Sequence, residues 1–205
     1  MSQSKASGKR LYETVNSVLS PEGNSYSDHV FKNREGATLN TCIRLCRADE
    51  IDVITDLQTR VYDSIGNKNT FVLTTGEELS ESLSLDVCLG VYDGVKLIAF
   101  TLMVVNRNTS RNLGYSLGYD ESKCLKCVTN DTTFTDLDYQ GYGVQRHLLE
   151  IKHAIASKLG AEEMLATVSP ENHVSLRNLM SEGFEIASDK PMYGGYRRFI
   201  MRRKV

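Results

Sequence analysis

The sequence predicts an α/β fold of the α+β kind, with one mixed β-sheet flanked by helices. Asp93-Gly94 separates two apolar runs, which is a strong signal for an antiparallel hairpin. Later in the chain, a strand, an amphipathic helix and a second strand follow one another over residues 123–169. Hairpins early and a β-α-β unit late predict a sheet that has both antiparallel and parallel neighbours.

Before the hairpin, the sequence predicts one strand and two helices. Residues 41–46, TCIRLC, alternate between polar and apolar positions, which is typical of a strand. Residues 74–83 favour a short helix with Thr75 as its N-cap. Residues 48–65 favour a longer helix, because its apolar residues recur at helical spacing: Ile51, Ile54, Leu57, Val61 and Ile65.

After the hairpin, a polar connection over residues 106–122 leads to a β-branched, strand-like segment, 123–136. A helix is predicted over 143–159, with Gly160 placed to end it. Its apolar stripe consists of Val144, His147, Leu148, Ile151, Ile155 and Leu159. A strand over 162–169, a helix over 170–182 and strands over 183–187 and 196–203 complete the order.

Residues 1–40 are expected to be a loosely structured N-terminal arm, and residues 41–205 to form the main domain. The arm is rich in Ser, Asn, Gly and Lys. Leu11, Val15 and Leu19 fall at helical spacing before Pro21, so one short helix is expected within the arm.

The composition favours a soluble globular protein with one core. The chain has 205 residues, 40% of them hydrophobic, and a formal net charge of -2, which gives no general attraction to nucleic acid. No apolar run approaches the roughly 20 residues of a membrane-spanning helix. The N-terminal segment MSQSKASGKR has no apolar region of a secretory signal, so we expect a cytoplasmic protein.

The five cysteines are expected to be reduced thiols, because their number is odd and no signal peptide is present. Cys124 and Cys127 have the spacing of half a zinc site, but no second such pair exists, so no metal is expected. The basic segment YRRFIMRRK, 196–204, is interpreted as a strand with outward-facing arginines. Contact with RNA or an acidic substrate ranks second, and a zinc or nucleic-acid module remains a third function hypothesis.

A glycine-rich turn at the start of the 143–159 helix predicts an anion site. Gly141 and Gly143 leave the backbone open, and the first N–H groups of a helix lack intrahelical partners. The chain has no GxxxxGK[ST] segment, which excludes a nucleotide P-loop. It also lacks the third glycine of a dinucleotide-binding turn. By itself, the turn is also compatible with a strand-to-helix connection that binds nothing.

Two motifs in order define a family resemblance. YQGYGVQ, 139–145, is similar to a Gln/Arg-x-x-Gly-x-Gly/Ala signature through Gln140 and Gly143, with Gln145 in place of the last small residue. NHVSLRNLMSEGFEI, 172–186, is similar to an Asn-x-x-Ala run that ends in Gly-Phe, with Asn172 and Ser175 in place. Together with the element order, they resemble the GNAT superfamily of acyl-CoA-dependent N-acetyltransferases over about residues 41–205.

This resemblance implies a sheet of about six or seven strands that splays open beside the strand before the signature. The pantetheine arm of acetyl-CoA would lie in the gap and bond the backbone of Phe134 and Thr135. Asn172 and Ser175 would touch the cofactor near its thioester end. The pyrophosphate would lie on Gln140, Gly141, Tyr142, Gly143, Val144 and Gln145.

The resemblance also implies direct attack of an amine on the thioester in a ternary complex. Asp131 is the candidate general base, because it lies four residues before Thr135 and alternation puts both on one strand face. A solvent-facing Asp131 is equally compatible with the sequence. Leu179 occupies the position where many relatives carry a proton-donating Tyr. Either Tyr193 or a water then protonates the thiolate, or the thiolate leaves unassisted. Tyr193 is the named candidate acid, although the sequence favours a structural place for it in a hairpin.

The predicted function is transfer of an acetyl group from acetyl-CoA to a primary amine of a small molecule or peptide. The alternative is a non-catalytic acyl-CoA-binding protein, supported by Leu179. The acceptor is expected between residues 62–83 and the last strands, with Asp63, Glu77 and Glu78 as charges that could attract an amine. A sheet edge shared at the C-terminal strands would give a homodimer.

Overall fold

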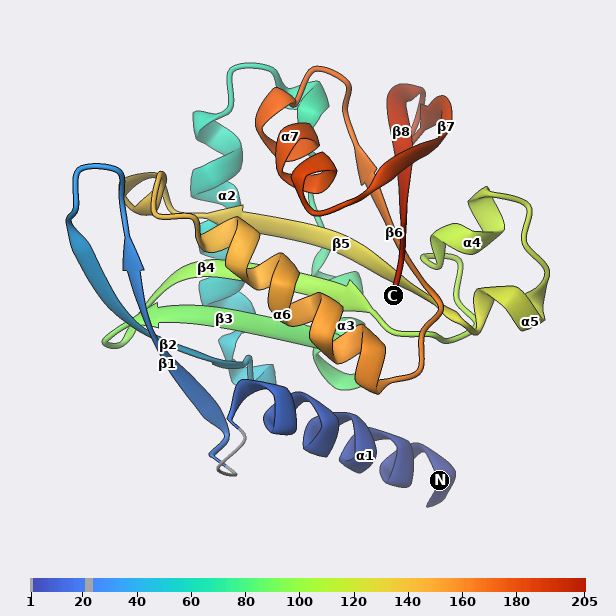
Figure 1. Cartoon of the computed structure of the whole chain (residues 1–205), viewed down its shortest axis with the longest axis horizontal. Coiled ribbons are helices and arrows are strands. Elements are labelled where there is room, and N and C mark those ends of the chain that lie inside the picture. Colours follow the sequence, from blue (N-terminus) through green and yellow to red (C-terminus); the bar gives the residue numbers. More distant parts are fainter. Residues whose placement is uncertain (1, 21–23) are drawn as a thin grey trace.

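The structure, a computed structural model, describes residues 2–20 and 24–205, with side chains described from residue 8 onward. Its centre is one eight-stranded mixed sheet with the order β1-β2-β3-β4-β5-β6-β8-β7 (Figure 1). The β5–β6 pair is parallel and every other pair is antiparallel. The strands are β1 (Tyr26–Lys32), β2 (Thr38–Leu45), β3 (Val87–Asp93), β4 (Lys96–Val104), β5 (Cys127–Thr135), β6 (Glu163–Val168), β7 (Glu185–Met192) and β8 (Tyr196–Lys204).

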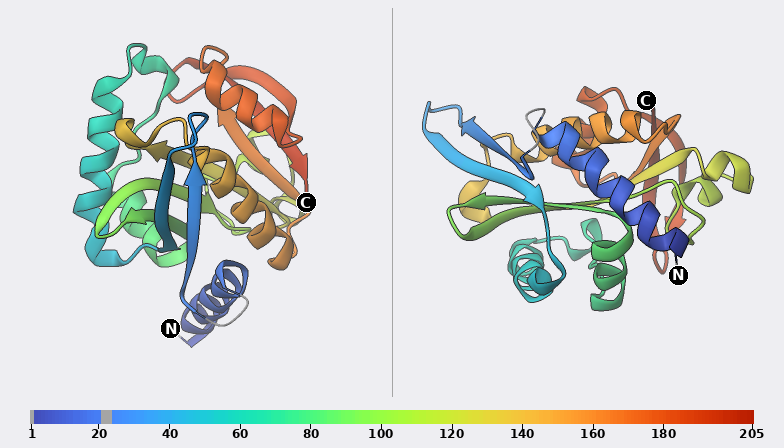
Figure 2. Two further views of the ribbon diagram at one scale, coloured as in Figure 1. Left: turned by 60° about the vertical axis from the view of Figure 1, so that its left-hand side comes forward. Right: turned by 90° about the horizontal axis from the view of Figure 1, so that it is seen from below.

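Helices cover both faces of this sheet (Figure 2). The α-helices are α1 (Ser2–Leu19), α2 (Ile51–Ser64), α3 (Gly76–Leu85), α4 (Leu113–Ser116), α5 (Glu121–Cys124), α6 (Val144–Lys158) and α7 (His173–Ser181). Short 3-10 turns lie at Ala48–Glu50 (η1), Lys68–Thr70 (η2) and Leu137–Tyr139 (η3). Helices α1 and α6 lie on one face, and α2 and α3 lie on the other. The mixed sheet flanked by helices is therefore confirmed.

The N-terminal residues contain more structure than the loose arm with one short helix that the sequence suggested. Helix α1 runs over 18 residues, and Val15 and Leu19 are buried in the core beside α6. Strand β1 pairs with β2 over its whole length, which brings the sheet to eight strands. The pattern of β1 is weak because only Phe31 is buried. Pro21, the expected end of α1, lies outside the described residues.

Most local predictions for residues 41–205 are confirmed. Thr75 caps α3, because its hydroxyl accepts a bond from the N–H of Glu78 at 3.2 Å and the Glu78 carboxylate bonds the Thr75 N–H in return. Asp93 pairs with Lys96 at the end of the β3–β4 hairpin, and Gly94 in its turn has a φ of +57°. Helix α6 begins and ends within one residue of the predicted bounds.

The sheet opens between β5 and β6. The two strands pair only from Cys127 opposite Glu163 to Asn130 opposite Ala166. Beyond that point β5 continues along β4 to Thr135, and β6 continues along β8 to Val168. The splayed sheet that the resemblance implied is therefore present.

A β-bulge lies where the strands part. Thr101 pairs with Thr133 and Met103 with Asn130, so two residues of β5 stand opposite a single residue of β4. After the bulge, the side chains of β5 change face: Val128 packs in the core below α6, whereas Phe134 packs in the core below α2 and α3. The regular alternation expected through this strand is interrupted here.

Candidate functional site

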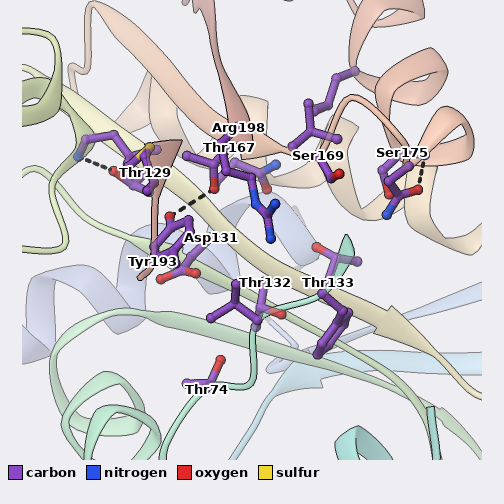
Figure 3. A pocket seen from close by; sticks show the side chains of 18 of the residues that line it. Thr74, Thr129, Asp131, Thr132, Thr133, Thr167, Ser169, Ser175, Tyr193 and Arg198 are labelled. Carbon is purple, nitrogen blue, oxygen red and sulfur yellow. Dashed lines mark hydrogen bonds between the residues drawn. The ribbon is translucent and has the colours of Figure 1, made fainter. Parts of the chain in front are cut away.

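A pocket of about 280 Å³ occupies the gap between β5 and β6. Its floor is the parting strands, residues 129–133 and 167–169, and one wall is formed by α6 and α7 (Figure 3). The opposite end is bounded by residues 70–74, which begin at the last residue of η2, and by the β7–β8 turn. We call this end the acceptor side, because the sequence analysis expects the acceptor there. The pocket thus lies where the resemblance placed the thioester, and the acceptor side is bounded by the two predicted segments.

The signature loop, residues 140–143, leads into α6 outside the pocket. Gly141 and Gly143 have φ values of +86° and +78°, in the left-handed region that favours glycine. A Cβ at either glycine would meet no atom within 4 Å, so the space above the loop is open. Gly143 is the N-cap of α6 and supplies no side-chain cap, while its carbonyl accepts the first helical bond from His147. The first N–H groups of α6 therefore point toward open space.

Three side chains join α6 to α7 along the pocket wall, and a fourth caps α7 beside them. The amide nitrogen of Gln145 donates to the hydroxyl of Ser175 at 3.3 Å, and its amide oxygen accepts from Asn178 at 2.7 Å. Asn172 is the N-cap of α7, because its amide oxygen accepts from the Ser175 N–H at 3.1 Å. Gln145, in the place of the small signature residue, therefore fixes α7 beside the signature loop.

The free backbone groups of β5 in the gap belong to alternate residues. The N–H of Asp136 donates to the carbonyl of Ile98 at 2.8 Å, and hydrogen-bonded pairs alternate along an antiparallel ladder. Phe134 opposite Phe100 is the next such pair, so its backbone groups face β4. Thr133 and Thr135 direct their N–H and C=O groups toward the gap. This geometry favours Thr135, as predicted, but Thr133 rather than Phe134.

Asp131 lines the pocket and is paired with Arg111, whose guanidinium nitrogen lies 2.6 Å from one carboxylate oxygen. Burial raises the pKa of this carboxyl above its usual value, and Arg111 opposes the rise. Because of the bulge, Asp131 and Thr135 do not share a face: Asp131 faces Arg111, whereas Thr133, two residues before Thr135, contacts Lys152 of α6. The expectation that Asp131 and Thr135 share a strand face is therefore wrong, although Asp131 does line the pocket.

Tyr193 reaches the same pocket from the β7–β8 turn. Its backbone has a φ of +50°, which is uncommon for a residue with a Cβ. Its phenol is 3.0 Å from the hydroxyl of Thr167, and Figure 3 shows the ring beside Asp131. Burial raises the pKa of Tyr193, which keeps the phenol protonated. Leu179 also lines the pocket and offers no proton.

Lys152, which the sequence analysis missed, lies at the base of the pocket. Its side chain is 1% exposed, and the nitrogen donates to the hydroxyls of Thr101 at 2.5 Å and Thr133 at 3.2 Å. Burial lowers the pKa of Lys152 to about 7, and Asp131 acts in the opposite direction. Lys152 lies four residues after Leu148, on the apolar stripe of α6, and this position was the signal in the sequence that its side chain is buried.

Arg198 is the second missed residue, and it corrects the interpretation of the basic C-terminal strand. Arg197 and Arg202 do form ion pairs across β7–β8, with Asp189 and Glu185. Arg198 instead is 3% exposed and lines the pocket. Its direction could not be read from the pattern, because three consecutive residues, Tyr196 to Arg198, are polar or amphipathic.

The other residues that the sequence analysis singles out have mainly structural surroundings. His147 stacks on His29 of β1, with ring centroids 3.8 Å apart. Glu78 lines the pocket, although its carboxylate is used in the α3 capping box; Asp63 and Glu77 do not line the pocket. Cys124 and Cys127 are buried and donate to the carbonyls of Tyr119 and Lys123, and burial raises the pKa of both thiols. Within residues 2–20 and 24–205, no cluster of three or more metal-ligating side chains occurs.

In the described part of the chain, no helix combines the length and apolar character needed to cross a membrane.

Several solved structures share this architecture. Ribosomal-protein-S18-alanine N-acetyltransferase from Escherichia coli is 16% identical, with a TM-score of 0.60 over 80% of this chain and 94% of its own. The GNAT domain of S. lividans PAT is 16% identical, with a TM-score of 0.61 over 87% and 97%. PaiA N-acetyltransferase from Thermoplasma acidophilum, in complex with coenzyme A, is 15% identical, with a TM-score of 0.57 over 80% and 99%.

No protein-family model and no curated protein sequence matches the chain. At these identities the likeness concerns the fold, and it covers at least four fifths of the chain in each of the three comparisons. The chain has the fold of the GNAT acetyltransferases.

Proposed function

We propose that the protein transfers an acetyl group from acetyl-CoA to a primary amine. The observation that carries this proposal is the open N-terminus of α6, with Gly141 and Gly143 in left-handed conformations, beside a sheet that parts to leave a pocket. Unpaired N–H groups and the helix dipole at Val144 and Gln145 would bind the diphosphate. The free backbone groups of Thr133 and Thr135 would bond the pantetheine arm in the gap.

The proposed reaction needs three proton transfers besides the attack. One proton passes from the substrate ammonium to the carboxylate of Asp131, and the neutral nitrogen attacks the thioester carbonyl carbon. The C–S bond then breaks, and its electron pair remains on sulfur. Tyr193 protonates the thiolate and regains a proton from the new amide nitrogen. An ammonium and acetyl-CoA thus give the acetamide, coenzyme A with a free thiol, and one released proton.

Calorimetry with acetyl-CoA tests the cofactor site. Gly143→Asp would place a carboxylate in the seat of the diphosphate, and we expect it to weaken binding by at least about tenfold. Gly118→Asp is the matched control, because Gly118 has a φ of +76° and the same open space but lies between α4 and α5. Equal affinity in both variants, or no binding of acetyl-CoA to the wild type at millimolar concentration, would overturn the proposal.

A second candidate is an acyl-CoA-binding protein without turnover. The buried side chain of Leu179 in the pocket favours it, because a leucine donates no proton to the leaving thiolate. Thiol release measured with a panel of primary amines separates the two functions. Turnover above the rate of hydrolysis supports the transferase, whereas tight acetyl-CoA binding without turnover on any amine supports the binding protein.

A further inference from the structure

Arg198 places a buried guanidinium at the acceptor side of the pocket. Its side chain extends from β8 into the cavity that Thr167 of β6 and the following Ser169 also line (Figure 3). Two of its nitrogens donate to backbone carbonyls, one to Arg197 at 3.0 Å and one to Asn69 of η2 at 2.7 Å. These bonds fix the direction of the side chain, and they leave further N–H donors of the guanidinium available to a ligand.

In the described part of the chain, no carboxylate pairs directly with this guanidinium, although Glu171 acts on it from a longer distance. Among the residues that the structure describes, no acidic oxygen lies within 4.0 Å of Arg198, whereas its neighbours Arg197 and Arg202 each have a carboxylate partner. A buried cation without a counter-ion is costly to fold, because the carbonyl dipoles replace only part of its hydration. An anionic ligand in the pocket would supply the missing charge.

The cofactor is an unsuitable source of that anion. Its negative groups would lie on the signature loop and the N-terminus of α6, and residues 140–144 do not line the pocket. Arg198 instead lines the pocket together with Thr70 and Tyr193. These two residues belong to the two segments that bound the acceptor side. The anion that Arg198 would bind therefore belongs to the acceptor.

The charge of the pocket limits the kind of anion. Arg111 is already paired with Asp131, and burial lowers the pKa of Lys152 below the gap to about 7. Glu78 adds a further carboxylate to the lining. One free guanidinium balances a single negative charge, which suits a carboxylate better than a phosphate of charge -1.5 to -2. The planar fork of arginine also matches the two oxygens of a carboxylate.

We propose that the acceptor is a small amino carboxylic acid, whose carboxylate binds Arg198 while its amine faces Asp131. This inference rests on the proposed acetyl transfer and adds the substrate class to it. The acidic group at Asp131 and the basic group at Arg198 would receive the two ends of a zwitterion within one pocket. The covalent step is unchanged: the amine of the acid is acetylated, and its carboxylate takes no part in the bond changes.

Matched substrates test the proposal. Initial rates are measured for amino acids, for their carboxamides and for the amines that lack the carboxyl group. For the wild type, we expect kcat/KM to be at least about tenfold higher for an acid than for its carboxamide. In Arg198→Gln, the value for the acid should fall by a similar factor, mainly through KM, and the value for the carboxamide should stay constant. Arg198→Lys keeps the charge and should retain part of the preference.

Arg197→Gln is the matched control, because this neighbour is exposed and pairs with Asp189 on β7. It should leave the preference for acids intact. A wild type without preference for acids, or an Arg198→Gln variant that loses both activities equally, overturns the proposal. Thermal unfolding of Arg198→Gln and Arg198→Lys shows whether either variant fails to fold.

Product binding separates this inference from the proposed function. Calorimetry in the presence of coenzyme A compares an N-acetylamino acid with its carboxamide, and it needs no turnover. Tighter binding of the acid in the wild type, lost in Arg198→Gln, supports the carboxylate site even when no amine is acetylated. Equal affinities in a protein that binds acetyl-CoA and acetylates other amines overturn the substrate class and leave the transferase function standing.

Discussion

The side-chain nitrogen of Lys152 lies 3.2 Å from the hydroxyl of Thr133, at the point where β5 leaves β6. A second hydroxyl, that of Thr101, also accepts from this nitrogen, and the two hydroxyls are 2.6 Å apart. This threonine pair can satisfy its own hydrogen bonds without the lysine. The ammonium is therefore surrounded by dipoles and is not paired directly with a carboxylate.

Replacing Lys152 by methionine should stabilise the protein at neutral and acidic pH. The pKa of Lys152 is about 7 in the folded chain and 10.5 as an ordinary side chain, so between these values the unfolded chain binds more protons. The stability of the wild type should rise with pH through this window, and the full penalty should remain below pH 7. Lys152→Met removes this penalty and should raise the free energy of unfolding by on the order of 1–4 kcal/mol at pH 6.

Denaturant unfolding at pH 6, 8 and 10 measures this effect. The advantage of Lys152→Met should be largest at pH 6 and should shrink as the pH approaches 10. Lys32→Met, at an exposed position on β1, is the control and should show no such trend. A constant difference between Lys152→Met and the wild type across these pH values would contradict a lowered pKa.

The fold could be predicted because its signals are local. The hairpin at Asp93-Gly94, the cap at Thr75 and the apolar stripe of α6 each depend on neighbours within a few residues, and each is present. Strand β1 was missed because its register depends on pairing with β2, and its own pattern buries only Phe31. The resemblance to acetyltransferases supplied the gap in the sheet.

The site was less predictable because three of its properties arise from tertiary structure. The bulge beside Asp131 changes the face of every later residue of β5, and alternation counted along the sequence cannot detect it. Lys152 and Arg198 are long, charged side chains that composition rules place in solvent. Their burial is decided by the pocket, which forms only when β5, α6 and β8 come together.

Removing Arg111 should move the acidic limb of the pH–rate profile. Burial raises the pKa of Asp131, and the charge and hydrogen bond of Arg111 hold it down. Asp131 accepts the substrate proton only when ionised, so kcat/KM should rise with pH through its pKa. In Arg111→Met the opposing interaction is lost, and the limb should shift to higher pH.

Acetylation rates between pH 4 and pH 9 give this profile. Arg202→Met removes the surface pair with Glu185, outside the pocket, and should leave the limb in place. Asp131→Asn should abolish the limb together with most of the activity. An unchanged limb in Arg111→Met would show that another group accepts the proton.

Tyr193→Phe should lower kcat and leave KM and stability nearly unchanged. The phenol is bonded to Thr167 beside Asp131, and burial keeps it protonated across the working pH range. Loss of a general acid reduces rates by about 10²–10⁴-fold, and phenylalanine keeps the ring and the left-handed backbone position. Steady-state rates and thermal unfolding of the variant measure the two effects.

Tyr196→Phe is the matched control, because both tyrosine rings lie within 5.8 Å of the Arg198 guanidinium carbon but only Tyr193 lines the pocket. A full rate in Tyr193→Phe would remove the phenol from the mechanism. The proton would then come from a water or from Lys152, which also lines the gap. If Lys152 is the donor, kcat should fall as the pH rises through about 7, where Lys152 loses its proton, and Lys152→Met should eliminate this fall.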